Sequence, residues 1–324
     1  MALRPTRRQL LAAAAAMAAR PAAAQADWPS RPIRLVVPFA PGGTTDVMAR
    51  LLAESIGPRL GQSIIVENRA GAGATVGAAA VARAAPDGYT LLMSNSSSHG
   101  VSPTLYPNIP YDSIGDFTHI GLVATSPSVL VVTAVHPART LRDFLDLARE
   151  QREIRFAVAG IGTSSHLAGV RLGMALGVPI TAVPYRGAGP AMTDTIAGVV
   201  PAMLDSLPSA AQHFRNGSVR ALGVTAASRV PAYANLPTMR EAGVDLISMA
   251  WFGVSAPRDL PRDISLRIAT AIQATLRDPR IIERFADLLG TPPPEMAPDA
   301  YAAFVEEEIR NFAPLVRQAG LQPS

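Results

Sequence analysis

The feature that most constrains the fold is a short apolar segment followed by a glycine turn and an amphipathic segment. Residues 33–37 are apolar except for Arg34 and suit a strand, and residues 41–43, Pro-Gly-Gly, break it and permit positive φ. Apolar residues recur with helical spacing at 47–57, and the Thr-Thr-Asp at 44–46 can cap that helix. Such a turn leaves backbone N–H groups free at the positive end of a helix, so it predicts a site for a carboxylate or phosphate. An ordinary turn with nothing bound is the alternative.

Strands and helices alternate along the rest of the chain. Strands are expected at 63–67 and 89–94, and again at 154–159 and 180–184, with helical segments between them. Such alternation predicts parallel sheets with helices on both faces. We further expect strands at 128–135, 203–206, 220–225 and 251–256, and helices at 141–151, 167–176, 262–277, 279–289 and 298–319.

Polar or glycine-rich loops follow three of the expected strands, at 94–99, 160–166 and 185–190. Ligands of open α/β sheets bind at the carboxyl ends of the strands, where these loops lie. Two strand–turn–helix units are built alike, one in each half of the chain. They therefore predict two lobes that face a shared cleft.

The late strand expected at 251–256 has no partner left in its own half of the chain. We therefore expect the chain to cross between the lobes twice. Lobe 1 would combine residues 27–127 and 250–324, and residues 128–249 would form lobe 2 as a continuous insert.

The first 26 residues have the pattern of an export signal. Arg7 and Arg8 form a twin-arginine-like pair, and an Ala-rich apolar run follows that is too short for a membrane anchor. Ala24-Gln25-Ala26 fits a cleavage site, so we expect cleavage after Ala26 and a periplasmic mature protein. Export by the twin-arginine or the general secretory route is left open, and a basic N-terminus on a cytosolic protein is the alternative.

Charge and cysteine content exclude several classes of partner. The chain has 29 basic and 25 acidic residues, and four of the arginines lie in the expected signal, which holds no acid. The mature chain therefore carries 25 residues of each sign. No basic block is interleaved with aromatic residues, so we expect no nucleic-acid partner, and we expect no membrane insertion of the mature chain. The chain has no cysteine, which excludes disulfides and a lipoprotein anchor.

The sequence offers no constellation typical of an enzyme. Gly71, Gly73 and Gly77 imitate a dinucleotide fingerprint, but the last spacing is one residue too long, which favours helix packing. Ser165 precedes His166, yet neighbours at a helix start point about 100° apart, and no Gly-x-Ser-x-Gly elbow is present. The five histidines lack metal-ligand spacing. We therefore expect no catalytic residue, no metal and no cofactor.

A series of short motifs spans the mature chain. They lie at 28–29, 37–43, 66–73, 86–92, 111–112, 116–117, 162–169, 183–187, 207–210, 236–238, 241–243 and 251–253. In this order they resemble the periplasmic solute receptors of tripartite tricarboxylate transporters, also called Bug receptors. Two positions depart from the family pattern: Val170 replaces a usual Glu, and Pro201 a frequent Asp.

This resemblance implies an α/β fold of the two-lobe type II periplasmic-binding-protein (Venus-flytrap) class, each lobe a mixed, mostly parallel sheet flanked by helices. It implies a monomer that binds a small carboxylate between the lobes and delivers it to the large and small membrane subunits of a transporter. In such receptors the loop that matches 41–46 holds a carboxylate through main-chain groups and ordered water, and the loop that matches 162–166 acts from the other lobe. A membrane sensor kinase as the partner, or an exported hydrolase, are the alternatives.

The expected ligand contacts come from the loops at the strand ends. Asp46 is either a helix cap or a ligand contact. Arg186, the one cation beside a predicted cleft loop, either binds a substrate carboxylate or forms an inter-lobe salt bridge. The full set of expected ligand-binding residues is Phe39, Ala40, Pro41, Gly42, Gly43, Thr44, Thr45, Asp46, Ser94, Asn95, Ser96, Gly162, Thr163, Ser164, Ser165, His166, Tyr185, Arg186, Gly187 and Asp205.

Overall fold

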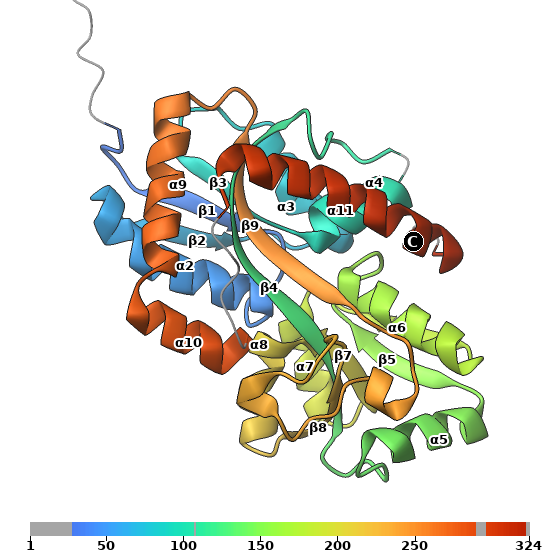
Figure 1. Cartoon of the computed structure of the whole chain (residues 1–324). Coiled ribbons are helices and arrows are strands. Elements are labelled where there is room, and N and C mark those ends of the chain that lie inside the picture. The colour runs from blue at the N-terminus through green and yellow to red at the C-terminus, as the bar shows by residue number, and fades with distance from the viewer. Residues whose placement is uncertain (1–27, 107, 290–295, 322–324) are drawn as a thin grey trace, which may run out of the picture.

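The computed structural model describes residues 28–106, 108–289 and 296–321 (Figure 1). The expected export signal lies outside these residues. The strands are β1 (Ile33–Val37), β2 (Ile64–Asn68), β3 (Thr90–Asn95), β4 (Phe117–Thr133), β5 (Ile154–Val158), β6 (Ile180–Pro184), β7 (Ala202–Ser206), β8 (Val219–Val224) and β9 (Met249–Pro257).

Helices connect and cover these strands. They are α2 (Thr44–Leu60), α3 (Thr75–Ala82), α4 (Ser102–Leu105), α5 (Leu141–Gln151), α6 (Ser164–Leu176), α7 (Ala188–Ile196), α8 (Leu207–Arg215), α9 (Arg262–Leu276), α10 (Pro279–Leu289) and α11 (Pro298–Gln318). Single helical turns are η1 (Ala72–Ala74), the π-helical η2 (Ser96–Val101), η3 (Pro231–Tyr233) and η4 (Arg240–Ala242). Among the described residues, none of these helices combines the length and the apolar character needed to span a bilayer.

The strands form one mixed, nine-stranded sheet in the order β2-β1-β3-β9-β4-β7-β5-β6, with β8 also paired to β4. β1 runs parallel to β2 and β3, and β5 runs parallel to β6 and β7. β9 is antiparallel to both of its neighbours, β3 and β4. The late strand therefore joins the N-terminal part of the sheet, although about 150 residues separate it in sequence from β3.

Strand β4 changes partners along its length. Residues from Phe117 to Pro127 pair with β9, whereas residues from Ser128 onward pair with β7 and β8. In Figure 1, β4 and β9 run side by side from the upper to the lower part of the molecule. We call β1, β2, β3, β9 and the start of β4 the first half-sheet, and β5 to β8 with the end of β4 the second half-sheet.

The predicted lobe boundaries, 127/128 and 249/250, fall at this change of partners and at the start of β9. The division into lobes itself stays a prediction. The strand expected at 128–135 is longer than predicted: β4 starts at Phe117, so the prediction covers only its last third. Proline cannot donate to a sheet ladder, so Pro127 is tolerated where one partner strand gives way to the next.

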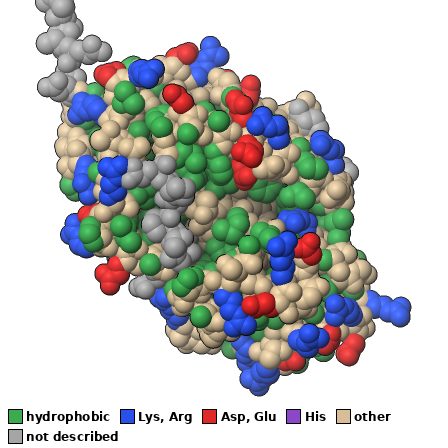
Figure 2. All heavy atoms as spheres, in the orientation of Figure 1, with side chains coloured by type: hydrophobic (Ala, Val, Ile, Leu, Met, Phe, Trp, Pro, Cys, Tyr) green, Lys and Arg blue, Asp and Glu red, His purple; other side chains and the backbone are tan. Residues whose placement is uncertain are grey.

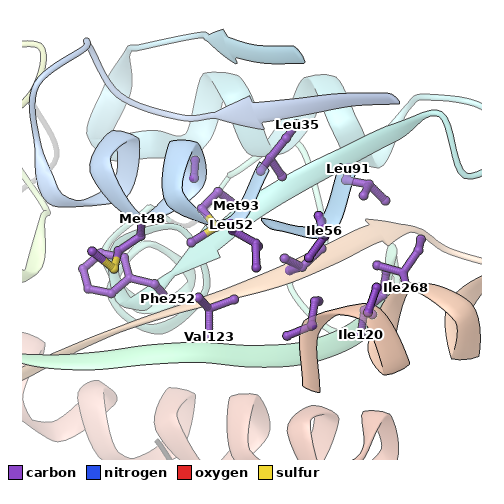
Figure 3. Packing of buried hydrophobic residues seen from close by; sticks show 14 of the residues in the cluster. Leu35, Met48, Leu52, Ile56, Leu91, Met93, Ile120, Val123, Phe252 and Ile268 are labelled. Carbon is purple, nitrogen blue, oxygen red and sulfur yellow. The ribbon is translucent and has the colours of Figure 1, made fainter. Parts of the chain in front are cut away.

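The core of the first half-sheet lies between its strands and helices α2 and α9. Leu35 of β1, Leu91 of β3, Met48 and Leu52 of α2 and Ile268 of α9 are nearly inaccessible to solvent. Figure 3 shows these side chains pointing toward one another across the helix–sheet interface. Burying each such side chain stabilises the fold by about 1.5–3 kcal/mol. This core fixes the start of α2 beside the end of β1.

The second half-sheet is buried on both faces. Leu130 and Val132 of β4 pack in one apolar cluster with residues of α5 and α6, while Val129 and Val131 pack in another with residues of α7 and α8. Successive residues of a strand point to opposite faces of the sheet. Because helices cover both faces here, every residue from Val129 to Val132 has to be apolar to pack against them. Helices α6, α7 and α8 follow β5, β6 and β7, whose carboxyl ends lie on one side of this half-sheet, whereas α5 follows the opposite end, that of β4.

Candidate functional site

A cavity lies between loops of the two half-sheets, and the space free of protein atoms there, with the open solvent at its edge included, is about 430 Å³. We call it the central cavity. The first half-sheet contributes Phe39, Gly43, Thr44, Thr45, Asn95, Ser96, Ser97, Ala250 and Phe252 to its lining. The second contributes Ala159, Thr163, Ser164, Ser165, Ala188, Asp205 and Ser206.

Four helices of nine residues or more begin at this lining. Helix α2 follows Gly43, α6 follows Thr163, α7 starts at Ala188 and α8 follows Ser206. The first N–H groups of a helix have no partner within the helix, and the aligned peptide dipoles add partial positive charge there. Positive helix ends therefore surround the central cavity, which suits an anion. Some of their N–H groups have partners: Thr163 accepts the His166 N–H at the start of α6, and Thr44 accepts the Ser209 N–H at the start of α8.

The lining contains no full positive charge. None of its described residues is Lys, Arg or His, and Asp205 is its single ionisable side chain. On the surface, by contrast, Arg and acidic side chains are interspersed (Figure 2). An anion in this cavity would thus be held by N–H and hydroxyl donors rather than by a salt bridge.

Glycines let the loops around the cavity touch each other. The Ala40 N–H donates to the Arg186 carbonyl oxygen at 3.0 Å, which joins the two half-sheets through main chain. A Cβ on Gly189 would overlap the Pro41 carbonyl oxygen, and one on Gly187 would lie 3.0 Å from the Ala40 nitrogen. Only residues without a side chain permit this approach.

The first turn departs from the sequence prediction in two ways. Positive φ occurs at Gly42, with φ 88°, whereas Gly43 has an extended backbone with φ −84°. Gly43 is also the N-cap of α2, and no side chain caps the helix, so the predicted capping by Thr44, Thr45 or Asp46 is wrong. An uncapped helix start leaves its N–H groups available to a ligand.

Asp46 braces the loop instead. Its carboxylate accepts hydrogen bonds from the Gly42 N–H at 3.1 Å, from Asn68 at 3.0 Å and from Arg50 at 3.0 Å. Burial raises the pKa of Asp46, but hydrogen bonds from Arg50, Asn68 and the Gly42 N–H outweigh burial and hold it below its usual value. The carboxylate is thus charged and fully engaged, and it lies outside the central cavity lining.

Direct side-chain contacts also join the two half-sheets. The Thr44 hydroxyl donates to Ser209 Oγ at 2.9 Å and accepts the Ser209 N–H at 3.2 Å. The Ser164 N–H donates to Ser97 Oγ at 3.1 Å. These bonds link the first turns of α2 and α6 to the opposite half, so the structure has its halves closed on each other.

Asp205 lies at the carboxyl end of β7 and is 3% exposed. Its Oδ2 accepts the Ser209 hydroxyl at 2.5 Å, and its Oδ1 accepts the Ser206 N–H at 2.8 Å. Burial raises the pKa of Asp205 to about 6, against the lowering effect of these two hydrogen bonds. Asp205 is therefore a carboxyl group that titrates near neutral pH beside the cavity.

Ser165 and His166 do not act as a pair in the part of the chain that is described. Ser165 Oγ is hydrogen-bonded to Thr163 Oγ1 at 3.0 Å, and His166 Nδ1 accepts the Gly162 N–H at 3.2 Å. Burial lowers the pKa of His166, which keeps its ring neutral. In the same residues, no group of three or more His, Cys, Asp or Glu side chains could hold a metal ion.

Half of the expected contact residues line the central cavity and half do not. Those in the lining are Phe39, Gly43, Thr44, Thr45, Asn95, Ser96, Thr163, Ser164, Ser165 and Asp205. Those outside it are Ala40, Pro41, Gly42, Asp46, Ser94, Gly162, His166, Tyr185, Arg186 and Gly187. Ser97, Ala159, Ala188, Ser206, Ala250 and Phe252 line it without having been predicted.

Tyr185 and Arg186 line a neighbouring space, about 530 Å³ with its open solvent included, which we call the side pocket. It shares Phe39 and Ala159 with the central cavity. The Tyr185 hydroxyl donates to Asp194 at 2.7 Å, and Arg186 is exposed. The cation predicted for the cleft thus stands beside the central cavity and not in its wall.

Comparison with known proteins identifies the family. The family described as "Tripartite tricarboxylate transporter family receptor" matches residues 48–321. The protein BugT of Bordetella pertussis is 36% identical over 296 residues, which cover 90% of each chain. The structure of the periplasmic binding protein BugD has a TM-score of 0.87 and 38% identity, and covers 91% of this chain and 99% of its own.

A third relative has a ligand. The structure of MatC from Rhodopseudomonas palustris, with bound malate, has a TM-score of 0.84 and 35% identity, and covers 89% of this chain and all of its own. These likenesses confirm the predicted two-lobe periplasmic-binding-protein fold and the predicted family. The chain belongs to the tripartite tricarboxylate transporter receptor family, the periplasmic solute-binding proteins that include the Bug proteins.

Proposed function

We propose that this chain is a periplasmic receptor that binds a small organic carboxylate in the central cavity and delivers it to a tripartite tricarboxylate-type membrane transporter. The observation that carries the proposal is the convergence of four helix starts on a cavity without Lys or Arg. Malate, a carboxylate, is bound by a relative of 35% identity.

The main-chain donors account for the binding energy. Each hydrogen bond from an N–H group to a carboxylate contributes roughly 1.5–3 kcal/mol. The donors at the starts of α2 and α6 come from opposite half-sheets, so a carboxylate between them is held by both. The ligand contacts are the lining residues together with the braced loop from Ala40 to Gly42 and ordered water.

The two half-sheets act as lobes, with residues 27–127 and 250–324 in one and 128–249 in the other. The change of partners along β4 supports this division, as does the pairing of β9 with β3. Ligand binding favours the closed arrangement because the carboxylate bridges donors that separate when the lobes open.

The chain is exported by its N-terminal segment and acts without catalysis, as a monomer. Membership in a family of solute receptors supports a binding role, and the fixed partners of Ser165 and His166 leave no nucleophile–base pair. Delivery then requires the large and small transporter subunits to recognise the closed form.

A thermal-shift screen of the mature chain tests the binding proposal. Mono-, di- and tricarboxylates are each compared with the corresponding carboxamide, which has a similar shape and no charge. A bound carboxylate at 100 times its Kd adds about 2.7 kcal/mol, which raises Tm by roughly 5 °C. Equal stabilisation by the carboxamides, or none by any carboxylate, would contradict the proposal.

A further inference from the structure

The acidic side chain of Asp205 lies in the lining of a cavity that otherwise suits an anion. It is the single ionisable side chain of the lining, and it is 3% exposed. A carboxylate ligand with no other functional group would bring a second negative charge beside it. Like charges in a buried site repel strongly, because the surrounding protein screens them poorly.

The hydrogen bonds of Asp205 leave acceptor capacity unused. A carboxylate offers about four lone-pair positions. The Ser206 N–H and the Ser209 hydroxyl fill two of them. Asp46, which is also little exposed, has Arg50, Asn68 and the Gly42 N–H as partners. A buried carboxylate without a cation is costly unless further donors reach it.

The elements packed around Asp205 supply no compensating charge among the described residues. On α2, Asp46 is engaged with its own partners. On α6, His166 is kept neutral by burial. Asp205 pairs with Val129 on β4, and α7 presents Ala188 to the cavity. On α8, His213 lies two turns beyond the helix start and does not line the cavity.

We infer that Asp205 determines specificity by accepting a hydrogen bond from a hydroxyl or ammonium group of the ligand. The site then takes hydroxy- or amino-carboxylates in preference to unsubstituted ones. The ligand carboxylate lies at the helix starts, and its donor group meets the unused lone pairs of Asp205. This inference rests on the proposed function and names the ligand class of that same site.

The same carboxylate is tied to the opposite half of the molecule. Ser209 donates to Asp205 and accepts from Thr44, the first residue of α2. A hydrogen bond to an ionised acceptor is stronger than one to a neutral acceptor. A ligand that keeps Asp205 ionised therefore also strengthens the bond chain that reaches Thr44, and so favours closure.

Proton exchange distinguishes this role from a merely structural one. Because burial raises the pKa of Asp205, a share of the closed, unliganded molecules carries a proton there at pH 6. A ligand with a donor group selects the ionised form and releases that proton. An unsubstituted carboxylate selects the protonated form and takes a proton up.

Calorimetry on the mature chain at pH 6 tests the inference with ligands that differ by one group. The series are succinate, malate and aspartate; glutarate, 2-hydroxyglutarate and glutamate; and propionate, lactate and alanine. Each is titrated in two buffers of different ionisation enthalpy, which measures the protons exchanged, and the protons that the free ligand itself carries at pH 6 are subtracted. We expect at least about a tenfold preference for a hydroxy or amino member, with net release of protons from the protein.

Two variants separate the role of the Asp205 carboxylate from that of its hydrogen bond to Ser209. Asp205→Asn should abolish the preference and the proton release. Ser209→Ala keeps the carboxylate, so it should keep the preference while binding all members more weakly. Carboxylates that bind without preference, or with no proton release, overturn the inference and leave the proposed function standing. If no member of any series binds, both the inference about Asp205 and the proposed function are contradicted.

Discussion

At the scale of single residues, two buried aspartates next to the cavity have opposite roles. Asp46 is ionised and held by three hydrogen-bond donors, so it shapes the loop that ends β1. Asp205 has two donors and no cation, and burial raises its pKa. The first arrangement stabilises the fold, while the second keeps an acceptor ready for a ligand.

Ionisation of the buried Asp205 carboxyl group should lower the free energy of unfolding as pH rises. Its folded pKa, about 6, exceeds its ordinary value of 3.8, so the folded protein binds the proton more tightly than the unfolded chain does. Stability contributed by the protonated group is present below pH 3.8 and is lost as pH rises through 6, by roughly 3 kcal/mol. Asp205→Asn removes this loss. The free energy of unfolding of the variant, relative to that of the wild type, should therefore rise between pH 4 and pH 8. Urea denaturation at both values measures it, and a constant difference would contradict the account.

Arg186 offers a second test at this scale. Its exposed side chain lines the side pocket, which adjoins the central cavity at Phe39 and Ala159. A dicarboxylate long enough to reach it gains a charge-assisted contact that a monocarboxylate cannot make. Arg186→Gln should weaken such dicarboxylates by roughly tenfold, about 1.4 kcal/mol, and leave monocarboxylates nearly unchanged. Calorimetry on both ligand classes tests this, because an equal loss of affinity for both would indicate that Arg186 has a structural role.

At the scale of elements, local signals were sufficient where both ends of an element are marked in the sequence. The helix predicted at 141–151 has the observed bounds of α5, because Thr140 and Asp143 form a capping box before its apolar face. The strand predicted at 180–184 also has the observed bounds, those of β6. These elements are determined by their own residues.

Elements that depend on distant partners were missed. The first part of β4 contains Gly121 and Pro127, and its partner β9 is more than a hundred residues away. Helix α8 was not predicted, although a proline in the first turn is common in helices. The polar run at 96–98 was expected to be a turn but belongs to a buried π-helical segment. For the same reason the loops at the strand ends predicted ten of the sixteen lining residues, whereas Ala250 and Phe252 reach the cavity through the pairing of β9.

Gly189 of α7 provides a prediction at the element scale. Ala in a helix is more favourable than Gly by about 1 kcal/mol, so Gly189→Ala should not destabilise the unliganded protein. In the closed arrangement, however, the new Cβ would overlap the Pro41 carbonyl oxygen. We expect ligand affinity to fall at least about tenfold with Tm unchanged or higher.

Gly169 of α6 is the matched control. It is also a helical glycine, and a Cβ there would lie 3.5 Å from Phe156, an ordinary contact. Gly169→Ala should bind ligand like the wild type. If Gly189→Ala also bound normally by calorimetry, the close approach of the two loops would not be needed for binding.

At the scale of the whole molecule, two long strands connect the halves and a few polar contacts close them. β4 and β9 pass between the half-sheets side by side (Figure 1), while Thr44 with Ser209 and Ser97 with Ser164 bridge the cavity mouth. One apolar cluster also crosses this seam, because Leu167 of α6 packs with Leu105 of α4 and Phe312 of α11. Opening would therefore separate these apolar side chains as well as the polar contacts.

A crystal structure of the mature chain with a bound carboxylate tests the central claim most directly. The account predicts ligand oxygens within hydrogen-bond distance of main-chain N–H groups at the starts of both α2 and α6, with no Arg side chain in contact with that carboxylate. A ligand whose carboxylates all lie in the side pocket with Arg186, with none at the helix starts, would contradict it, as would a carboxylate that touches only one half-sheet.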